Sequence, residues 1–181
     1  MKISATPLQG VLLIEPTVFG DARGYFYESF NARRFAELTG VQASFVQDNH
    51  SRSAKGVLRG LHYQIQQAQG KLVRVTAGAI FDVVLDIRRS SPTFGRWHGV
   101  VLSAENKHEL WVPPGFAHGF TVTSDMAEVQ YKTTDYWAPE FERSVIWNDP
   151  AVGVAWPLDG EPLLSAKDRA GVPLAQAEVF P

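Results

Sequence analysis

The sequence predicts a mostly β protein, a sandwich or barrel of antiparallel strands that forms a single domain over residues 1–181. Three observations support this fold class. Short runs of β-branched and aromatic residues recur along the chain, 11 Pro and 15 Gly punctuate them, and only one segment has a clear helical pattern. Regularly spaced short runs with turn residues between them are typical of such folds. A chain of this length can bury about two thirds of its unfolded surface.

Two strands and one helix are expected in the N-terminal part of the chain. Val11–Ile14 and Tyr25–Phe30 each have the composition of a half-buried strand. The helix spans Asn31–Gly40, where the Asn can cap the first turn and the Gly can end the last one. Phe35 and Leu38 share one face of this helix, so it should lie against the sheet through that face.

The clearest strand is Phe81–Arg88, with the sequence FDVVLDIR. Because successive side chains of a strand point to opposite faces, its odd-numbered residues form an apolar face and its even-numbered residues a more polar one. This alternation predicts a strand that is buried on one face only. Further strands are expected at Arg59–Gln64, Leu72–Thr76, Val100–Leu102, Leu110–Val112, Gly119–Thr123 and Ala127–Thr133.

The C-terminal part of the chain has a different character. Leu164–Asp168 can form a second short helical turn. The segment from Pro150 onward is rich in proline and should be extended and wrap over the sheet. Residues 149–163 have little pattern and predict nothing specific about a pocket.

Composition excludes several classes of function. The net charge is −2, and no run of Lys or Arg exceeds two residues, so neither a nucleic acid nor an acidic membrane is an expected partner. The absence of Cys excludes disulfides, zinc–thiolate sites and thiol nucleophiles. No apolar run approaches the roughly 18 residues of a membrane helix. A cytoplasmic protein that binds small molecules is therefore expected.

Several well-known motifs are incomplete or missing. His108–Val112 (HELWV) begins like a zinc-protease helix but has Val112 where the second His ligand belongs. The chain has no G-x-S-x-G elbow, no Walker loop and no G-x-G-x-x-G. Side chains would have to hold any phosphate.

Two segments resemble the conserved stretches of the cupin superfamily, whose fold is a double-stranded β-helix or jelly-roll barrel. They are Gly56–His62 (GVLRGLH) and Pro113–His118 (PPGFAH). In metal-binding cupins a second His follows the first by two positions and a Glu comes soon after. This chain has Gln64 at that position and no Asp or Glu between it and Phe81. The ligand count is therefore too low for a zinc or iron site, and no metal is expected.

His62 can be a structural strand residue or a catalytic one, and its pattern alone does not decide between them. Charged and polar neighbours favour a role in binding or chemistry, because burying such groups is costly unless the site is wet and holds an anion. These neighbours are Arg59, Lys71, His118, Tyr131 and Lys132.

Longer matches make the resemblance specific. The chain is similar to the dTDP-4-dehydrorhamnose 3,5-epimerase family from about Phe19 to Asp168. The segments that carry this similarity are FGDARGYFYE, FVQDNHS, VLRGLHYQ, QGKLVRV, DVVLDIR, SPTFG, LWVPPGFAHGF and LSAKD. The resemblance implies a cofactor-free cupin homodimer that acts on dTDP-4-dehydro-6-deoxy-D-glucose in the pathway to dTDP-L-rhamnose.

The same resemblance implies four catalytic residues. Inversion at two carbons next to a ketone needs a base on one face, an acid on the other and a group that holds the enolate oxygen. His62 is the implied base and Asp168 the carboxylate that orients it. Tyr131 is the implied acid, and Lys71 lies near the C4 oxygen. Taken without the family, these are a surface or helix-end Asp, a core Tyr and a solvated Lys.

A second group of residues is implied to bind the dTDP-sugar. Arg59 and Arg23 can each pair with phosphate oxygens. Tyr136, rather than Trp137, is expected to stack on thymine. Arg23 and Glu28 lie on a strand that should reach the pocket of the neighbouring subunit. The full set is Arg23, Glu28, Gln47, Asp48, Asn49, Arg59, Lys71, His118, Tyr136, Glu142 and Lys167.

Three alternatives remain open on the sequence. Some relatives invert only C3 or only C5 of other dTDP-4-keto-6-deoxy sugars, although the presence of Tyr131 favours the double epimerase. A metal-dependent cupin enzyme is less consistent with the ligand count. A cupin that binds a sugar nucleotide or stores material without turning it over would need none of the four catalytic roles.

Overall fold

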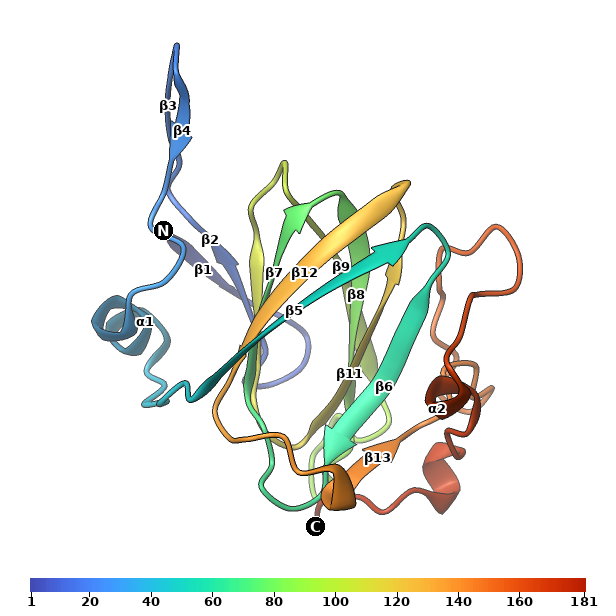
Figure 1. Ribbon diagram of the computed structural model, residues 1–181. Coiled ribbons are helices and arrows are strands. Elements are labelled where there is room, and N and C mark those ends of the chain that lie inside the picture. Colours follow the sequence, from blue (N-terminus) through green and yellow to red (C-terminus); the bar gives the residue numbers. More distant parts are fainter.

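The computed structural model describes residues 1–181 and consists mainly of two antiparallel β-sheets that face each other (Figure 1). The larger sheet contains, in spatial order, β1 (Lys2–Ala5), β2 (Leu12–Glu15), β10 (Glu109–Val112), β7 (Lys71–Ala77), β12 (Met126–Thr133) and β5 (Gln47–Ala54). The smaller sheet contains β13 (Glu142–Ser144), β6 (Leu58–Gln64), β11 (Phe116–Val122), β8 (Ala79–Asp86) and β9 (Trp97–Ser103). The predicted mostly β fold is confirmed.

Two short helices accompany the sheets, as predicted. Helix α1 covers Ala32–Thr39, and α2 covers Ala166–Arg169. The Asn31 side chain accepts a hydrogen bond from the Arg34 N–H, and Gly40 ends α1 in the left-handed conformation with φ of 71°. Neither helix has the length or hydrophobicity needed to cross a membrane. Two single 3-10 turns, at Pro139–Phe141 and Leu174–Gln176, complete the helical structure.

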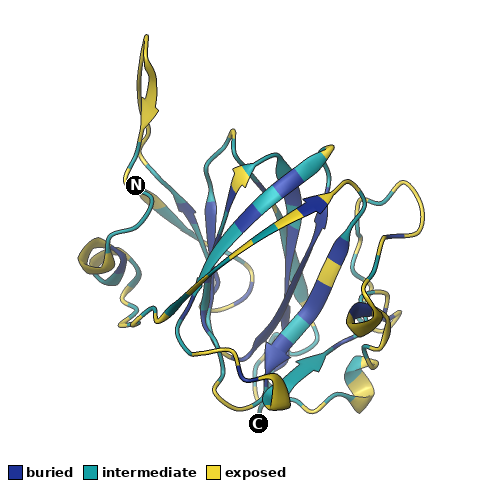
Figure 2. Cartoon of the chain, in the orientation of Figure 1, coloured by how far each residue is buried: buried dark blue, intermediate teal, exposed yellow.

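The strand predicted at Tyr25–Phe30 is wrong in its extent. The structure has a small separate hairpin here, in which β3 (Phe19–Asp21) pairs only with β4 (Gly24–Phe26). No third strand borders this hairpin, so residues 27–30 have no backbone partner that would extend the pairing. The hairpin projects from the body of the protein beside the N-terminus (Figure 1) and is exposed along its whole length (Figure 2).

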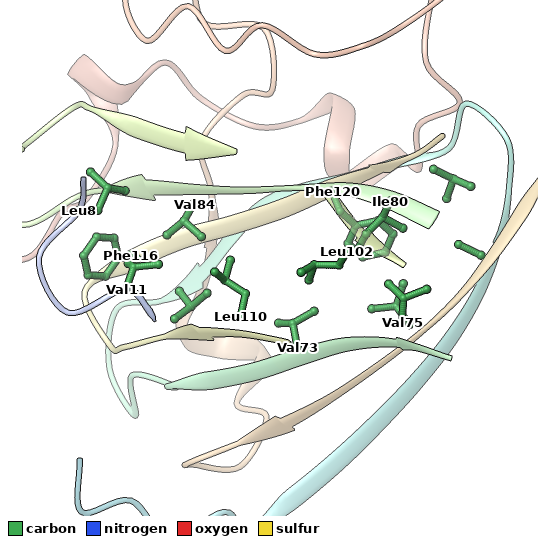
Figure 3. Packing of buried hydrophobic residues seen from close by; sticks show 14 residues of the cluster. Leu8, Val11, Val73, Val75, Ile80, Val84, Leu102, Leu110, Phe116 and Phe120 are labelled. Atoms are coloured by element: carbon green, nitrogen blue, oxygen red, sulfur yellow. The ribbon is translucent and has the colours of Figure 1, made fainter. Parts of the chain in front are cut away.

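The main core lies between the two sheets. It contains 14 buried hydrophobic residues, which Figure 3 shows packed in the space that the strands enclose. Val73 and Leu110 enter it from the larger sheet, and Val84 and Phe120 enter it from the smaller one. These side chains fill only part of the space between the sheets. The remainder is a polar cavity.

The expectation that Phe81–Arg88 is buried on one face only is wrong. Strand β8 ends at Asp86, and Asp82, Val84 and Asp86 are as inaccessible as the Val83 and Leu85 that alternate with them. The strand is covered on its second face by the C-terminal part of the chain. Strand β8 is therefore buried on both faces because a segment that comes later in the sequence covers its second face.

The C-terminal segment wraps over the smaller sheet, as predicted. Val152, Trp156 and Phe180 pack against a second buried cluster on the outer face of that sheet. The Tyr63 hydroxyl donates a hydrogen bond of 2.5 Å to the carbonyl of Glu178. Because α2 belongs to this segment and packs against β6, the wrap also brings Asp168 next to the barrel.

Candidate active site

A cavity of about 380 Å³ opens between the two sheets beside the core. Its walls are mostly polar, with only three hydrophobic residues in the lining. The larger sheet contributes Lys71 and Tyr131, and the smaller sheet contributes His62 and His118. His62 and Tyr131 therefore belong to opposite walls. The full lining is Gln47, Asn49, Ser51, Arg59, His62, Gln69, Lys71, His118, Gly119, Phe120, Tyr131, Trp137, Glu142 and Lys167.

His62 and Asp168 form a histidine–carboxylate pair at one wall. The distance between His62 Nε2 and Asp168 Oδ1 is 2.7 Å. The direction of the ring nitrogen departs from hydrogen-bond geometry, so the two groups interact mainly through charge when the ring is protonated. This arrangement leaves Nδ1 as the nitrogen of His62 that can accept a proton.

The position of Asp168 is fixed by its own short helix. The Ser165 hydroxyl accepts from the Asp168 N–H, and the Ser165 N–H donates to Asp168 Oδ2 at 3.3 Å, which is a capping box at the start of α2. The Ser165 hydroxyl also donates to Oδ2 at 2.5 Å. The Gly60 N–H donates to Oδ1 at 3.0 Å. Burial alone would raise the pKa of Asp168, but His62, Ser165 and Gly60 together hold that pKa well below its usual range. The carboxylate is thus charged and immobile.

Burial lowers the pKa of His62 below that of a free imidazole. Asp168 acts in the opposite direction because it favours the charged ring, while Lys167 and Lys71 lower the pKa further. The ring is therefore neutral at pH 7. A neutral imidazole with a fixed carboxylate behind it can accept a proton and can then be stabilised as imidazolium.

Lys71 and Tyr131 carry protons at neutral pH. Burial lowers the pKa of Lys71 to about 8, against the opposing effects of Glu142 and Asp82, so the ammonium form still prevails at pH 7. Burial, together with Glu142, raises the pKa of Tyr131. The cavity thus combines a neutral base, a cation and a protonated phenol, which are the groups that enolate chemistry requires.

The remaining cations of the cavity are held by neighbours. Arg59 donates from Nε to the Ser53 hydroxyl at 3.0 Å, which leaves its terminal nitrogens for an anion. Lys167 forms an ion pair with Glu142. No group of three or more His, Asp or Glu side chains converges as a metal-ligand set.

Ten of the predicted site residues lie at this cavity. Nine line it and Asp168 lies behind His62. Asp48 does not, because it points to the outer face of the larger sheet, where it pairs with Lys132 at 2.9 Å. Tyr136 is absent from the lining, whereas Trp137 is present and donates its backbone N–H to Gln47 Oε1 at 3.0 Å.

Arg23 and Glu28 also lie away from the cavity of their own chain. Arg23 is at the turn of the projecting hairpin, where its hydrogen bonds and its ion pair are all with Asp21 and its side chain is 90% exposed. Glu28 lies at the base of the hairpin, where it accepts a hydrogen bond from Asn31. Within one chain these two residues have no contact with the candidate site.

Some lining residues were missed by the sequence analysis. Ser51 follows Gln47 and Asn49 on the same face of β5, so the alternation of a strand would have indicated it. Gln69 and Phe120 have no comparable signal. Asp82 was also missed, although it accepts a hydrogen bond from the second cavity histidine, His118.

Comparison with protein families gives one match over most of the chain. The model described as dTDP-4-dehydrorhamnose 3,5-epimerase matches residues 5–176. The chain is 62% identical to the dTDP-4-dehydrorhamnose 3,5-epimerase of Pseudomonas aeruginosa over 181 residues, which is all of both chains.

Two solved structures show the same arrangement of the backbone. The epimerase of Legionella pneumophila, in complex with dTDP-4-keto-L-rhamnose, is 55% identical and superposes with a TM-score of 0.96 over 98% of this chain and 94% of that one. A 3′-monoepimerase from Streptomyces bikiniensis, in complex with dTDP-quinovose, is 37% identical with a TM-score of 0.89 over 94% of this chain and 86% of that one.

Proposed function

Because the chain belongs to the dTDP-4-dehydrorhamnose 3,5-epimerase family and is an isomerase of that kind, we propose that His62 and Tyr131 exchange protons at C3 and C5 of its sugar substrate. The observation that carries this proposal is the His62–Asp168 pair, which faces Tyr131 and Lys71 across one polar cavity. The fold is the cupin jelly roll of the solved relatives. Residues 1–181 act as one domain.

The reaction needs only proton transfers. The hydrogens on C3 and C5 are both next to the C4 carbonyl, so removal of either gives an enolate. His62 takes the proton at Nδ1, and Asp168 stabilises the imidazolium that forms. Tyr131 then donates its phenolic proton to the opposite face of the same carbon. Solvent restores both groups, and a second round inverts the other carbon.

Lys71 holds the enolate oxygen. An ammonium in a partly dehydrated cavity stabilises negative charge that develops on C4–O, and the loss of one such donor typically costs about 2.7 to 4 kcal/mol of transition-state stabilisation. The pKa of Lys71, about 8, leaves it charged at pH 7. It therefore serves as the electrophile throughout both proton transfers.

The nucleotide part of the substrate lies along the rest of the cavity. Binding of a dTDP-sugar is supported by the relatives that were solved with such ligands. The terminal nitrogens of Arg59 pair with the pyrophosphate, and Gln47, Asn49, Glu142 and Lys167 complete the binding surface. Trp137 lies at the cavity and Tyr136 beside it, so one of these two rings stacks on thymine.

The enzyme works as a homodimer in which the hairpin of each subunit completes the other pocket. A two-stranded hairpin that projects into solvent has too little buried surface to be stable by itself. Phe19, Tyr25 and Phe26 are each more than 60% exposed on it. Contact with a second subunit would cover these rings and would carry Arg23 to the pyrophosphate, and Glu28 to the pocket, of the neighbouring site.

Isotope exchange tests this function. The enzyme is incubated with dTDP-4-dehydro-6-deoxy-D-glucose in heavy water, and deuterium at each sugar carbon is measured by NMR. We expect incorporation at both C3 and C5, and the same result after treatment with a chelator. Deuterium at one carbon only would identify a single epimerase. The absence of deuterium at both carbons, or the loss of exchange with the chelator, would reject the proposed chemistry.

A further inference from the structure

A second histidine–carboxylate pair lies in the same barrel. His118 Nε2 is 2.9 Å from Asp82 Oδ2 and 3.0 Å from Oδ1. His118 pairs directly with His62 across β11 and β6, so two imidazoles enter the cavity side by side from one sheet. Asp82 comes from β8, the next strand of that sheet.

The Asp82 carboxylate is costly for the protein to keep. Its side chain is fully buried, and His118 provides its only hydrogen bond. A buried carboxylate with a single partner opposes folding unless other charges compensate it. Asp82 also acts on a cation, Lys71, which lies on the facing sheet. Burial lowers the pKa of Lys71, and the charge of Asp82 raises it.

We propose that Asp82 is a positioning residue for the epimerisation, which fixes the tautomer of His118 through the hydrogen bond at Nε2. With its Nε2–H donated to Asp82, the ring of His118 leaves Nδ1 to accept a hydrogen bond from a hydroxyl of the hexose. The two carboxylates, Asp168 and Asp82, thus have different roles. Asp168 serves the base, and Asp82 serves the groups that hold the sugar and its C4 oxygen. This inference rests on the proposed function.

The charge of Lys71 depends on several elements around it. Glu142 on β13 and Asp82 on β8 favour the ammonium, whereas Lys167 on α2 and burial oppose it. His62 on β6 also interacts with Lys71. Removal of the Asp82 charge leaves Glu142 as the only carboxylate that supports Lys71, so the lysine should lose its proton at a lower pH.

The first test compares two buried aspartates of one strand. Asp82→Asn removes a charge beside the cavity, and Asp86→Asn removes one that contacts Arg88, Ser91 and Thr93 instead. We expect Asp82→Asn to lower kcat by roughly 10- to 100-fold, the size of effect that outer partners of functional histidines have elsewhere. When kcat is plotted against pH, the fall in kcat on the alkaline side (the alkaline limb) should lie clearly below pH 8 for this variant. Asp86→Asn should lose thermal stability and keep the limb of the wild type.

A purely structural role for Asp82 makes the opposite prediction. Asp82→Asn would then lower the melting temperature as Asp86→Asn does, and the alkaline limb would not move. That outcome would overturn the inference, while deuterium exchange by the wild-type enzyme would still support the proposed function.

A measurement on the wild-type protein decides the matter if Asp82→Asn fails to fold. Nitrogen NMR of labelled histidine, with the signal of His118 assigned from a His118→Gln variant, reports which ring nitrogen carries the proton. We expect the signal of a ring that carries a proton at Nε2 and none at Nδ1. A ring protonated at Nδ1, alone or in addition to Nε2, would contradict the proposal, whatever the turnover of the enzyme.

Discussion

Burial and Asp168 act on the pKa of His62 in opposite directions, and the effect of burial is the larger one. The result is an imidazole that is free of its proton at neutral pH but has a carboxylate at 2.7 Å once it has gained one. A solvent-exposed histidine would have neither property to the same degree. These two properties of His62 are the most important chemical feature of the site at the scale of single residues.

Replacement of His62 by Asn should remove the base and keep the approximate size of the side chain. We expect kcat to fall by roughly 10² to 10⁴, as is typical for loss of a general base, with a smaller change in KM. Steady-state kinetics and titration with a dTDP-sugar analogue would measure the two effects. Turnover at the rate of the wild type would show that another group removes the proton.

The pH dependence follows from His62 and Lys71. In the proposed mechanism His62 must be neutral, and its lowered pKa means that activity should persist as the pH falls to below 6.5 before it declines. Lys71 must be charged, so activity should fall as the pH rises past about 8. The measurement is kcat against pH from 5 to 10.

Lys71→Arg provides the control for the alkaline limb. A guanidinium keeps its charge far above pH 8, so the limb should move upward even if the rate is reduced. Glu109 also has its pKa raised by burial to about 8, but it lies on the outer face of the larger sheet. A limb that stays near pH 8 in Lys71→Arg would assign it to Glu109 or another group.

Two substitutions can show whether Tyr136 or Trp137 stacks on thymine. Trp137 lines the cavity, whereas Tyr136 is absent from the lining, so loss of the indole should have the larger effect if each ring keeps its place on binding. We expect Trp137→Ala to weaken binding of dTDP by about 1–3 kcal/mol, which is typical of one stacked base. Calorimetry on both variants would measure it. A larger loss for Tyr136→Ala would favour the platform that the sequence suggested.

At the scale of residues, the positions of the site residues can be predicted from the sequence, but the partners they contact cannot. The strand predicted at Ala127–Thr133 contained Tyr131, and the spacing of Gly56–His62 singled out the histidine. The contact between His62 and Asp168 could be inferred only from the family resemblance, because the two residues meet through a segment of irregular structure. Asp82 looked like one polar residue in an alternating strand.

At the scale of elements, strand β8 shows the limit of periodicity. Its alternation correctly predicts a strand, but it cannot show that a later segment covers the second face. Strand β5 shows a different limit. Its sequence QDNHSRSA has no β-branched or aromatic residue, yet it pairs with β12 along its whole length. Pairing with a neighbour outweighs intrinsic preference here.

The turn after β8 depends on Asp86, and this dependence is testable. Burial would raise the pKa of Asp86, but hydrogen bonds from Arg88, Ser91 and Thr93 lower it to about 2. The charged form is therefore the stabilising one. Its contribution is complete above the unfolded pKa of about 3.9 and is lost as the pH falls towards 2.

Asp86→Asn should accordingly lower the free energy of unfolding at pH 7 by on the order of 2 kcal/mol. The difference between variant and wild type should shrink as the pH is lowered from 4 towards 2. Urea unfolding at several pH values measures both effects. An equal difference at pH 7 and pH 2 would mean that the charge of Asp86 does not provide the stabilisation.

At the scale of the whole molecule, the projecting hairpin is the part that a single chain does not explain. Arg23 and Glu28 were expected at a dTDP-sugar pocket, and in one chain they lie outside it. No pattern in a sequence states whether a residue serves its own subunit or another. The proposed dimer with exchanged hairpins would account for both the expected binding roles and the exposed rings of the hairpin.

Mixed dimers can test this exchange. Arg23→Ala and His62→Asn should each be poorly active alone. In a dimer with one subunit of each kind, one pocket would combine an intact His62 with the partner's intact hairpin. Random mixing after joint refolding should therefore restore about a quarter of wild-type activity, as the symmetry of a two-site dimer requires. If Arg23 serves its own subunit, mixing would restore nothing.

The wrap of the C-terminal segment has a consequence for the order in which the enzyme is made. Every strand of the two sheets precedes Asp168 along the chain. A ribosome therefore synthesises the strands that form the walls of the cavity before it adds the carboxylate that pairs with His62. A nascent chain that has emerged only as far as β13 would contain His62 without its partner, so full activity should begin only when the segment that follows has docked.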